Sequence, residues 1–245
     1  MKFIQDLLAL VLLMAVAVAG ADTVDATKAT GGLGNKGYIW NKMTREQADI
    51  LKLSGDFGRG KVAFQACRGC HRSDASGRAD GAYPRLTGQH ASVIIKQVTD
   101  TRAGLRVNPK MGPFASEHAV SPQEIADISV YLAYVQSEAE NGKGPGTNLA
   151  RGKRLYEENR CPDCHGRVGE GDASKVYPVL ASQHYQYALR EMQHVKEGSR
   201  ANAHPEMAKI LKRMTQADLE SLSVYVSRMP DYRRASSTSS AKSVN

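Results

Sequence analysis

Cys67-Arg68-Gly69-Cys70-His71 is a pentapeptide that returns later in the chain as Cys161-Pro162-Asp163-Cys164-His165. Both copies read C-x-x-C-H, the pattern that attaches a c-type haem covalently. Two thiols at this spacing can reach the two vinyl groups of one porphyrin, and the histidine that follows then points its imidazole at the iron. The sequence therefore predicts two covalent haems, with thioether bonds from Cys67, Cys70, Cys161 and Cys164, and with His71 and His165 as iron ligands.

Other uses of paired cysteines fit the pattern less well. A zinc site needs four ligands that converge on one ion, commonly from C-x-x-C pairs that lie closer in sequence, whereas these pairs begin 94 residues apart, at Cys67 and Cys161. A thioredoxin-like dithiol needs a βαβ context, and no strand pattern surrounds either motif. Structural disulfides stay possible in an exported protein, but they do not explain a histidine directly after both pairs.

The N-terminal residues 1–21 have the pattern of a signal peptide. Lys2 gives a weakly positive start, Leu7 to Ala19 form an apolar run, and Ala19-Gly20-Ala21 offers small residues for cleavage. A transmembrane helix needs about 20 apolar residues, so the run favours cleavage, with an uncleaved anchor as the alternative. Because c-type haem is attached outside the cytoplasm, both observations indicate export to the periplasm.

Length and charge set further bounds. The chain has 245 residues, 41% of them hydrophobic, which is room for two small domains. Its formal net charge is +8, yet no dense basic block or aromatic-interleaved patch suggests nucleic acid. A mildly positive surface instead steers encounter with acidic proteins or membrane surfaces. We therefore expect redox-protein partners and allow for peripheral membrane association.

The two motifs belong to a longer repeat. Shifting the chain by 94 residues superposes Tyr83-Pro84 on Tyr177-Pro178, Gln89-His90 on Gln183-His184, and the later apolar positions of each unit. A register held this long indicates a duplicated domain. We assign residues 56–137 and 151–229 to the two units, 138–150 to a Gly-rich linker, 22–55 to an N-terminal arm, and 230–245 to a disordered Ser-rich tail.

Each unit reads as helical. Helices are predicted over 60–66 and 151–159 before the haem motifs, over 92–102 and 185–196 after them, and from Pro122 and Thr215 at the end of each unit. Ser121-Pro122-Gln123-Glu124 combines an N-cap, a proline at the first helical position and a capping-box glutamate. The arm should hold a short helix from Thr44 to Leu53, and Trp40 should pack the arm onto the first domain, with partner docking as the alternative.

The second axial ligand of each iron is predicted to be a methionine, because a thioether suits a buried electron-transfer haem and raises its potential. Met111 is the only methionine between the first motif and the last helix of its unit. The second unit offers Met192, Met207 and Met214, and Met207 is preferred because Pro205-Glu206-Met207 echoes Pro109-Lys110-Met111. His204 remains an alternative ligand, and His90 and His184 are expected to bond backbone or a haem propionate.

With these residues in place, the chain resembles the dihaem cytochrome c4 family over about residues 56–229. The shared features are the two C-x-x-C-H sites and, in each half, Tyr-Pro-x-Leu, Gly-x-Arg, Pro-x-Met and a closing apolar helix. The resemblance implies an all-α protein of two tandem class I cytochrome c domains, related by a pseudo-twofold axis, each wrapped round one haem c.

The resemblance also implies roles for single residues. Pro84 and Pro178 would hold the carbonyl that orients each proximal imidazole, and Arg106 and Arg200 would pair with haem propionates. Two aromatic contacts between crossing helices are expected, Phe64 with Tyr131 and Tyr156 with Tyr225.

We read the chain as a periplasmic electron carrier and not as an enzyme. It would pass single electrons from a quinol-oxidising complex or a periplasmic dehydrogenase to a haem-copper oxidase or a reductase. A cytochrome subunit of a dehydrogenase, such as a flavocytochrome, is the first alternative. A dihaem peroxidase is the second, and it would need an open sixth position on one iron.

Overall fold

The computed structural model describes Trp40 and residues 42–231. The predicted signal peptide, most of the arm and the tail beyond Asp231 lie outside the described residues. In chain order the helices are α1 (Arg45–Ile50), α2 (Phe57–Ala63), the 3₁₀ turn η2 (Phe64–Ala66), α3 (Arg68–His71), α4 (Ala91–Arg102), α5 (Gly112–Ala115), α6 (Pro122–Tyr134), α7 (Leu149–Glu158), α8 (Pro162–His165), α9 (Tyr185–Glu197), α10 (Pro205–Lys212) and α11 (Gln216–Arg228).

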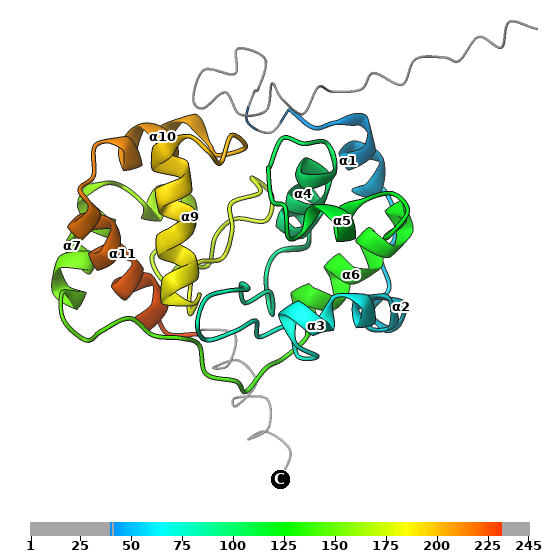
Figure 1. Cartoon of the computed structure of the whole chain (residues 1–245), viewed down its shortest axis with the longest axis horizontal. Helices are drawn as coiled ribbons and strands as arrows, with labels where there is room; N and C mark the ends of the chain where they lie inside the picture. Colours follow the sequence, from blue (N-terminus) through cyan, green and yellow to red (C-terminus); the bar gives the residue numbers. More distant parts are fainter. Residues whose placement is uncertain (1–39, 41, 232–245) are drawn as a thin grey trace, which may run out of the picture.

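The helices form two groups joined by an extended linker. Figure 1 shows α1 to α6 on one side of the molecule and α7, α9, α10 and α11 on the other. Within the described ranges no residue lies in a strand, and one isolated antiparallel bridge joins Asp172 to Tyr177. The predicted all-α class is therefore confirmed.

Two helices cross at close range in the first group, where α2 meets α6. A Cβ on Gly60 would lie 2.0 Å from the backbone oxygen of Asp127, so only glycine lets the backbones approach this closely. One turn further on, the rings of Phe64 and Tyr131 pack with centroids 5.4 Å apart. The predicted aromatic contact is confirmed.

The same crossing recurs between α7 and α11. A Cβ on Gly152 would lie 2.0 Å from the carbonyl oxygen of Ser221, and Tyr156 meets Tyr225 edge-on with centroids 5.4 Å apart. In both crossings the glycine precedes the aromatic residue by one helical turn. Repetition of this detail in both groups follows from the duplication.

The last helix of each group starts at a capping box. Ser121 Oγ accepts from the Glu124 N–H and the Glu124 carboxylate accepts from the Ser121 N–H, and Thr215 and Asp218 repeat the arrangement. The helices predicted from Pro122 and Thr215 are thus present. In contrast, α5 and α10 were not predicted, because one is a single turn and the other begins at a His-Pro pair that resembles a loop.

Each group has its own apolar core. The first is built around Phe64, Ile94, Ile128, Tyr131 and Leu132, and the second around Tyr156, Leu189, Leu211, Leu219 and Leu222. Ile50 of α1 packs against Ile95 and Ile125, so this short helix is part of the first domain's packing although it was predicted as part of the arm.

Trp40 contacts both domains. Its ring lies under the ammonium group of Lys96 of α4, 4.9 Å from the ring centroid. It also stacks on Tyr177 at 6.4 Å and meets His204 edge-on at 5.3 Å. The expectation that Trp40 packs onto the first domain is confirmed by its contact with Lys96, and Trp40 also packs onto the second domain through Tyr177 and His204.

The linker is packed against the second domain. Asn141 Nδ2 donates to the Ser227 carbonyl, and the N–H of Gly144 donates to Ser227 Oγ. The Tyr185 N–H at the start of α9 donates to the Gly142 carbonyl. Among the residues that the structure describes, none of the helices combines the length and the apolar character that a membrane span needs.

Candidate haem-binding sites

The first site is built at α3, a single helical turn that follows η2. Its last residue, His71, is buried with 8% of its surface exposed, while Cys67 and Cys70 are half-buried. His71 Nδ1 lies 3.4 Å from the Pro84 carbonyl oxygen. Because a carbonyl can only accept, Nδ1 carries the proton and Nε2 is left with its lone pair, the form in which imidazole binds a metal.

The second site repeats this geometry at α8. His165 is 9% exposed, and its Nδ1 lies 3.2 Å from the Pro178 carbonyl oxygen. Burial lowers the pKa of both His71 and His165, and the proline carbonyls raise it by a smaller amount. Both imidazoles are thus neutral near pH 7, as iron ligation requires.

Burial disfavours the thiolate form of the first cysteine of each motif, Cys67 and Cys161. Burial raises the pKa of Cys67, and it raises the pKa of Cys161 to about 11. All four thiols are free, so the structure contains none of the disulfides that the sequence left possible. Within the part of the chain that is described, no three His, Cys, Asp or Glu side chains converge as a zinc site would need.

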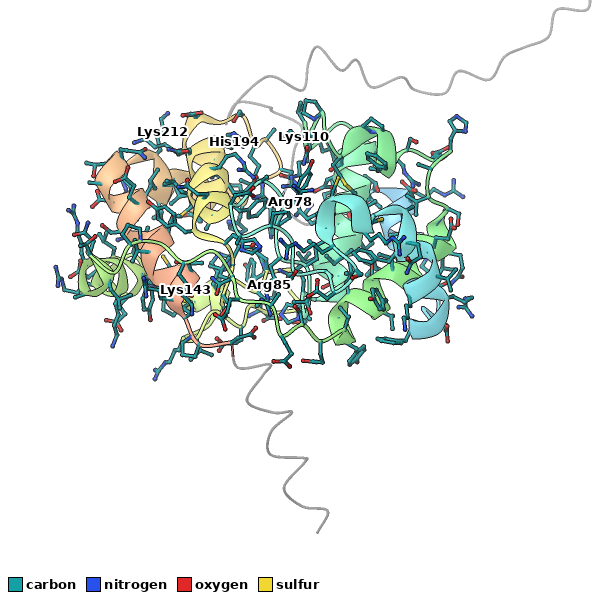
Figure 2. All side chains as sticks on the ribbon, turned by 60° about the horizontal axis from the view of Figure 1, so that its bottom comes forward. Arg78, Arg85, Lys110, Lys143, His194 and Lys212 are labelled. Atoms are coloured by element: carbon teal, nitrogen blue, oxygen red, sulfur yellow. The ribbon has the colours of Figure 1, made fainter. Side chains whose placement is uncertain are left out.

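A tyrosine lies beside each proximal histidine, a contact that was not predicted from the sequence. The rings of Tyr83 and His71 have centroids 5.9 Å apart. Two cations labelled in Figure 2 lie over Tyr83: Arg78 at 5.5 Å and Lys110 at 5.8 Å from the ring centroid. The repeated Tyr-Pro dipeptide after each haem motif was the available signal.

Among the described residues, the equivalent tyrosine of the second domain, Tyr177, is contacted by aromatic rings and not by cations. Tyr177 lies 6.5 Å from His165, ring centroid to ring centroid, and contacts both His204 and Trp40. His204 also adds to the lowering of the His165 pKa. The second site is therefore enclosed by aromatic rings where the first carries cations.

The two predicted axial methionines lie on the short helices that were missed. Met111 is the N-cap of α5, and Met207 lies in the first turn of α10, where it packs against the second apolar core together with Cys161 and Met192. Met214 is 6% exposed within that core. Since Met207 also lies in a helix, the helical position of Met192 is no longer a reason to prefer Met207 over Met192 as the iron ligand.

Arg106 and Arg200 meet at one carboxylate. Arg106 Nη2 lies 3.0 Å and Arg200 Nη1 lies 2.8 Å from Glu191 Oε2. Burial would raise the pKa of Glu191, but Arg200 and Arg106 outweigh it and hold the pKa below its usual value. The sequence did not single out Glu191, which is the counter-charge of both arginines.

The residues present fit a haem at each site. Each has two half-buried thiols on one helical turn, a buried neutral imidazole whose Nδ1 is already bonded, and an apolar core behind it. The buried indole Nε1 of Trp40, beside Tyr177, has no hydrogen-bond partner among the described residues. Such an orphan donor suits an acceptor that a prosthetic group brings, such as a propionate.

Comparison with known proteins gives the same picture. The family model described as cytochrome c matches twice, over residues 57–136 and 149–230. Cytochrome c4 of Azotobacter vinelandii is 27% identical over 207 residues, which covers 78% of this chain and 98% of that protein. The thiosulfate dehydrogenase electron acceptor of Stutzerimonas stutzeri is 31% identical over 193 residues, covering 75% and 87%.

The fold is also that of a solved structure. Reduced recombinant cytochrome c4 from Pseudomonas stutzeri superposes with a TM-score of 0.66 at 24% identity, over 72% of this chain and all of that one. Together with the two C-x-x-C-H motifs, these matches confirm two tandem cytochrome c domains and two covalent haems c. The chain belongs to the cytochrome c family, as a two-domain member homologous to cytochrome c4.

Proposed function

We propose that this protein is a periplasmic electron carrier that passes single electrons between a respiratory donor and a terminal oxidase or reductase. The observation that carries the proposal is the repetition of one haem-binding geometry in two domains that pack on each other. The expected donors are a quinol-oxidising complex or a periplasmic dehydrogenase, and the expected acceptors include a haem-copper oxidase.

A bound haem c supplies a reversible one-electron change at its iron, and the protein tunes it. The carbonyls of Pro84 and Pro178 orient the proximal imidazoles of His71 and His165 and increase their basicity. Met111 and Met207 would each provide the second protein ligand of one iron, and their thioethers would raise the reduction potentials. Arg106 and Arg200 are assigned to the propionates, with Glu191 as the group that holds both guanidinium ions in place.

The domain limits and the targeting belong to the same proposal. Residues 56–137 and 151–229 are the two haem domains, and residues 1–21 direct export and are then removed. The assignment of export agrees with covalent haem attachment, which takes place outside the cytoplasm. Edman sequencing of the mature holoprotein, with Asp22 as the expected first residue, tests the cleavage.

The first experiment is visible and near-infrared spectroscopy of the ferric holoprotein, with haem quantified per chain. Two haems with a full iron–thioether charge-transfer band support the carrier. A band of about half intensity would place His or an open position on one iron, and a peroxidase assay would follow. Reoxidation of the reduced protein by oxidase-containing membranes then tests electron delivery directly.

A second candidate function has its own observation. The 31% identical relative is an electron acceptor of thiosulfate dehydrogenase, so this chain could take its electrons from a dehydrogenase of a reduced sulfur compound, as a free acceptor or as its cytochrome subunit. Copurification of the tagged protein from periplasm decides between the two. A stoichiometric catalytic partner favours the subunit, and a monomer favours the free carrier.

A further inference from the structure

One histidine of each domain makes a hydrogen bond to the backbone of the other domain. His90, the N-cap of α4, has Nε2 2.8 Å from the carbonyl oxygen of Glu170. His184, the N-cap of α9, has Nε2 2.8 Å from the carbonyl oxygen of Ser76. Because both acceptors are carbonyls, each Nε2 carries the proton and donates. His184 is equivalent to His90 in the repeat, and Glu170 to Ser76, so the two bonds are reciprocal.

The preceding glutamines add the same reciprocal pattern. Gln89 Nε2 donates to the Val179 carbonyl and Gln89 Oε1 accepts from the Val179 N–H, at 3.1 and 2.9 Å. Gln183 makes the same two bonds with the backbone of Arg85, at 3.0 and 2.9 Å. Figure 2 labels Arg85 where the two domains meet. Each Gln-His pair therefore binds the other domain at two places.

The acceptors lie in the loops that hold the proximal histidines. Ser76 precedes Gly77, whose N–H donates to the His71 carbonyl at 3.0 Å, and Glu170 precedes Gly171, whose N–H donates to the His165 carbonyl at 2.9 Å. A shift of the His184 ring thus acts on the loop of the first haem site, and a shift of the His90 ring acts on that of the second.

The two histidines differ in how firmly they are held. His184 is 1% exposed, and its Nδ1 accepts from the Gly142 N–H of the linker at 2.9 Å. His90 is partly exposed. Burial lowers the pKa of His184, which the Ser76 carbonyl only partly offsets, so its ring is neutral with both nitrogens bonded. His184 therefore joins the second domain, the linker and the first haem site.

We propose that His90 and His184 are positioning residues for electron transfer between the two haems. They fix each proximal loop against the opposite domain and so hold the haems in one mutual orientation. With both haems bound, the step would move one electron from one iron, oxidised from ferrous to ferric, to the other iron, reduced from ferric to ferrous. This inference rests on the proposed function of the protein as a dihaem carrier.

The test uses the full-length holoprotein, half reduced, with electron exchange between the haems measured from the exchange of their paramagnetically shifted methyl proton signals. In His184→Ala we expect the exchange rate to fall by about tenfold, since the loss of a buried hydrogen-bonded side chain changes a conformational equilibrium by about that factor. His90→Ala should show a smaller fall. His184→Gln, which keeps a donor toward Ser76, should recover most of the rate, and the exposed His118→Ala should equal wild type.

A second readout separates positioning from general loosening. Hydrogen exchange of the Gly77 amide should speed up in His184→Ala, and that of Gly171 in His90→Ala, so that each substitution exposes the loop of the opposite domain. Loss of protection confined to the mutated domain would contradict the proposal. If His184→Ala fails to fold, His90→Ala gives both measurements.

The outcomes also distinguish this inference from the function that it assumes. If both alanine variants transfer electrons between the haems as fast as the wild-type protein does, the positioning role is wrong, while the proposed carrier function stands. A wild-type protein that holds two haems but exchanges no electron between them contradicts the proposed function itself. Haem content and the near-infrared band, measured on every variant, must stay unchanged for a lower rate to support positioning.

Discussion

Arg106 of the first domain and Glu191 of the second form an ion pair across the domain boundary, with Nη2 3.0 Å from Oε2. Both side chains are largely buried, and Arg200 shares the same carboxylate oxygen. Removing one partner of a buried ion pair leaves the other charge without compensation. The boundary between the domains is thus held by electrostatics as well as by the reciprocal Gln-His bonds.

Glu191→Gln should lower the free energy of unfolding by about 3 kcal/mol near pH 7, because two buried guanidinium groups lose their counter-charge. Guanidinium denaturation followed by the haem absorbance measures this. Since the pKa of Glu191 is held below its ordinary value of 4.5, the carboxylate stabilises the fold above about pH 4.5. The gap between wild type and variant should therefore close as the pH falls through the lowered pKa, and a gap that is constant with pH would contradict this account.

Removing the cysteine pair of one domain should halve the haem content. Cys161→Ala with Cys164→Ala is expected to leave one covalent haem, held at Cys67 and Cys70, because each motif attaches its own group. A pyridine haemochrome assay against protein concentration counts the haems. The matched pair Cys67→Ala with Cys70→Ala should give the same count. No loss in either variant would exclude attachment at that motif.

Replacing either axial methionine should remove about half of the near-infrared thioether band and lower one of the two reduction potentials, because a thioether ligand raises the potential. Met111→Ala and Met207→Ala are the test pair, followed by near-infrared absorption and redox titration. Met214→Ala is the control, since Met214 is a core residue and should affect stability alone. If Met192→Ala, and not Met207→Ala, removed the band, the assignment at the second iron would move to Met192.

The fluorescence of Trp40 should be almost completely quenched in the holoprotein. Trp40 is the only tryptophan of the chain, and its ring contacts Tyr177, which itself lies beside His165. A haem on His165 would quench its emission. Fluorescence during guanidinium unfolding should rise strongly as this contact is lost, and Trp40→Phe supplies the blank. Bright emission from the folded holoprotein would show that Trp40 does not lie against the second site.

The two capping boxes give a matched measure of helix stability. Ser121→Ala and Thr215→Ala should each lower the free energy of unfolding by about 1 kcal/mol, the usual effect of losing an N-cap hydrogen bond. Ser121→Asp and Thr215→Asp keep an acceptor and should stay near wild type. A large loss at only one of the two positions would mean that its helix has a further role in the packing between the domains.

The sequence by itself determined the features that depend on short stretches of chain, namely the haem motifs, the helix starts and the domain repeat. The C-x-x-C-H motifs, the capping box at Ser121, the helix start at Thr215, and the 94-residue register between Cys67 and Cys161 specify two helical haem domains, because caps, thiol spacing and helical periodicity act over a few residues. It also predicted that the equivalent residues His90 and His184 bond backbone or a haem propionate, without showing which of the two or in which domain the acceptor lies.

Only the tertiary structure decided what happens where the domains meet. Trp40 lies against both of them, Arg106 and Arg200 share Glu191, and His184 donates to Ser76, 108 positions away in the chain. Such contacts depend on how the surfaces of two folded domains fit together. The repeat in the sequence is compatible with many arrangements of the two domains, so it does not predict these contacts. The haem sites are thus encoded locally, while the geometry that joins them comes from the packing of one domain on the other.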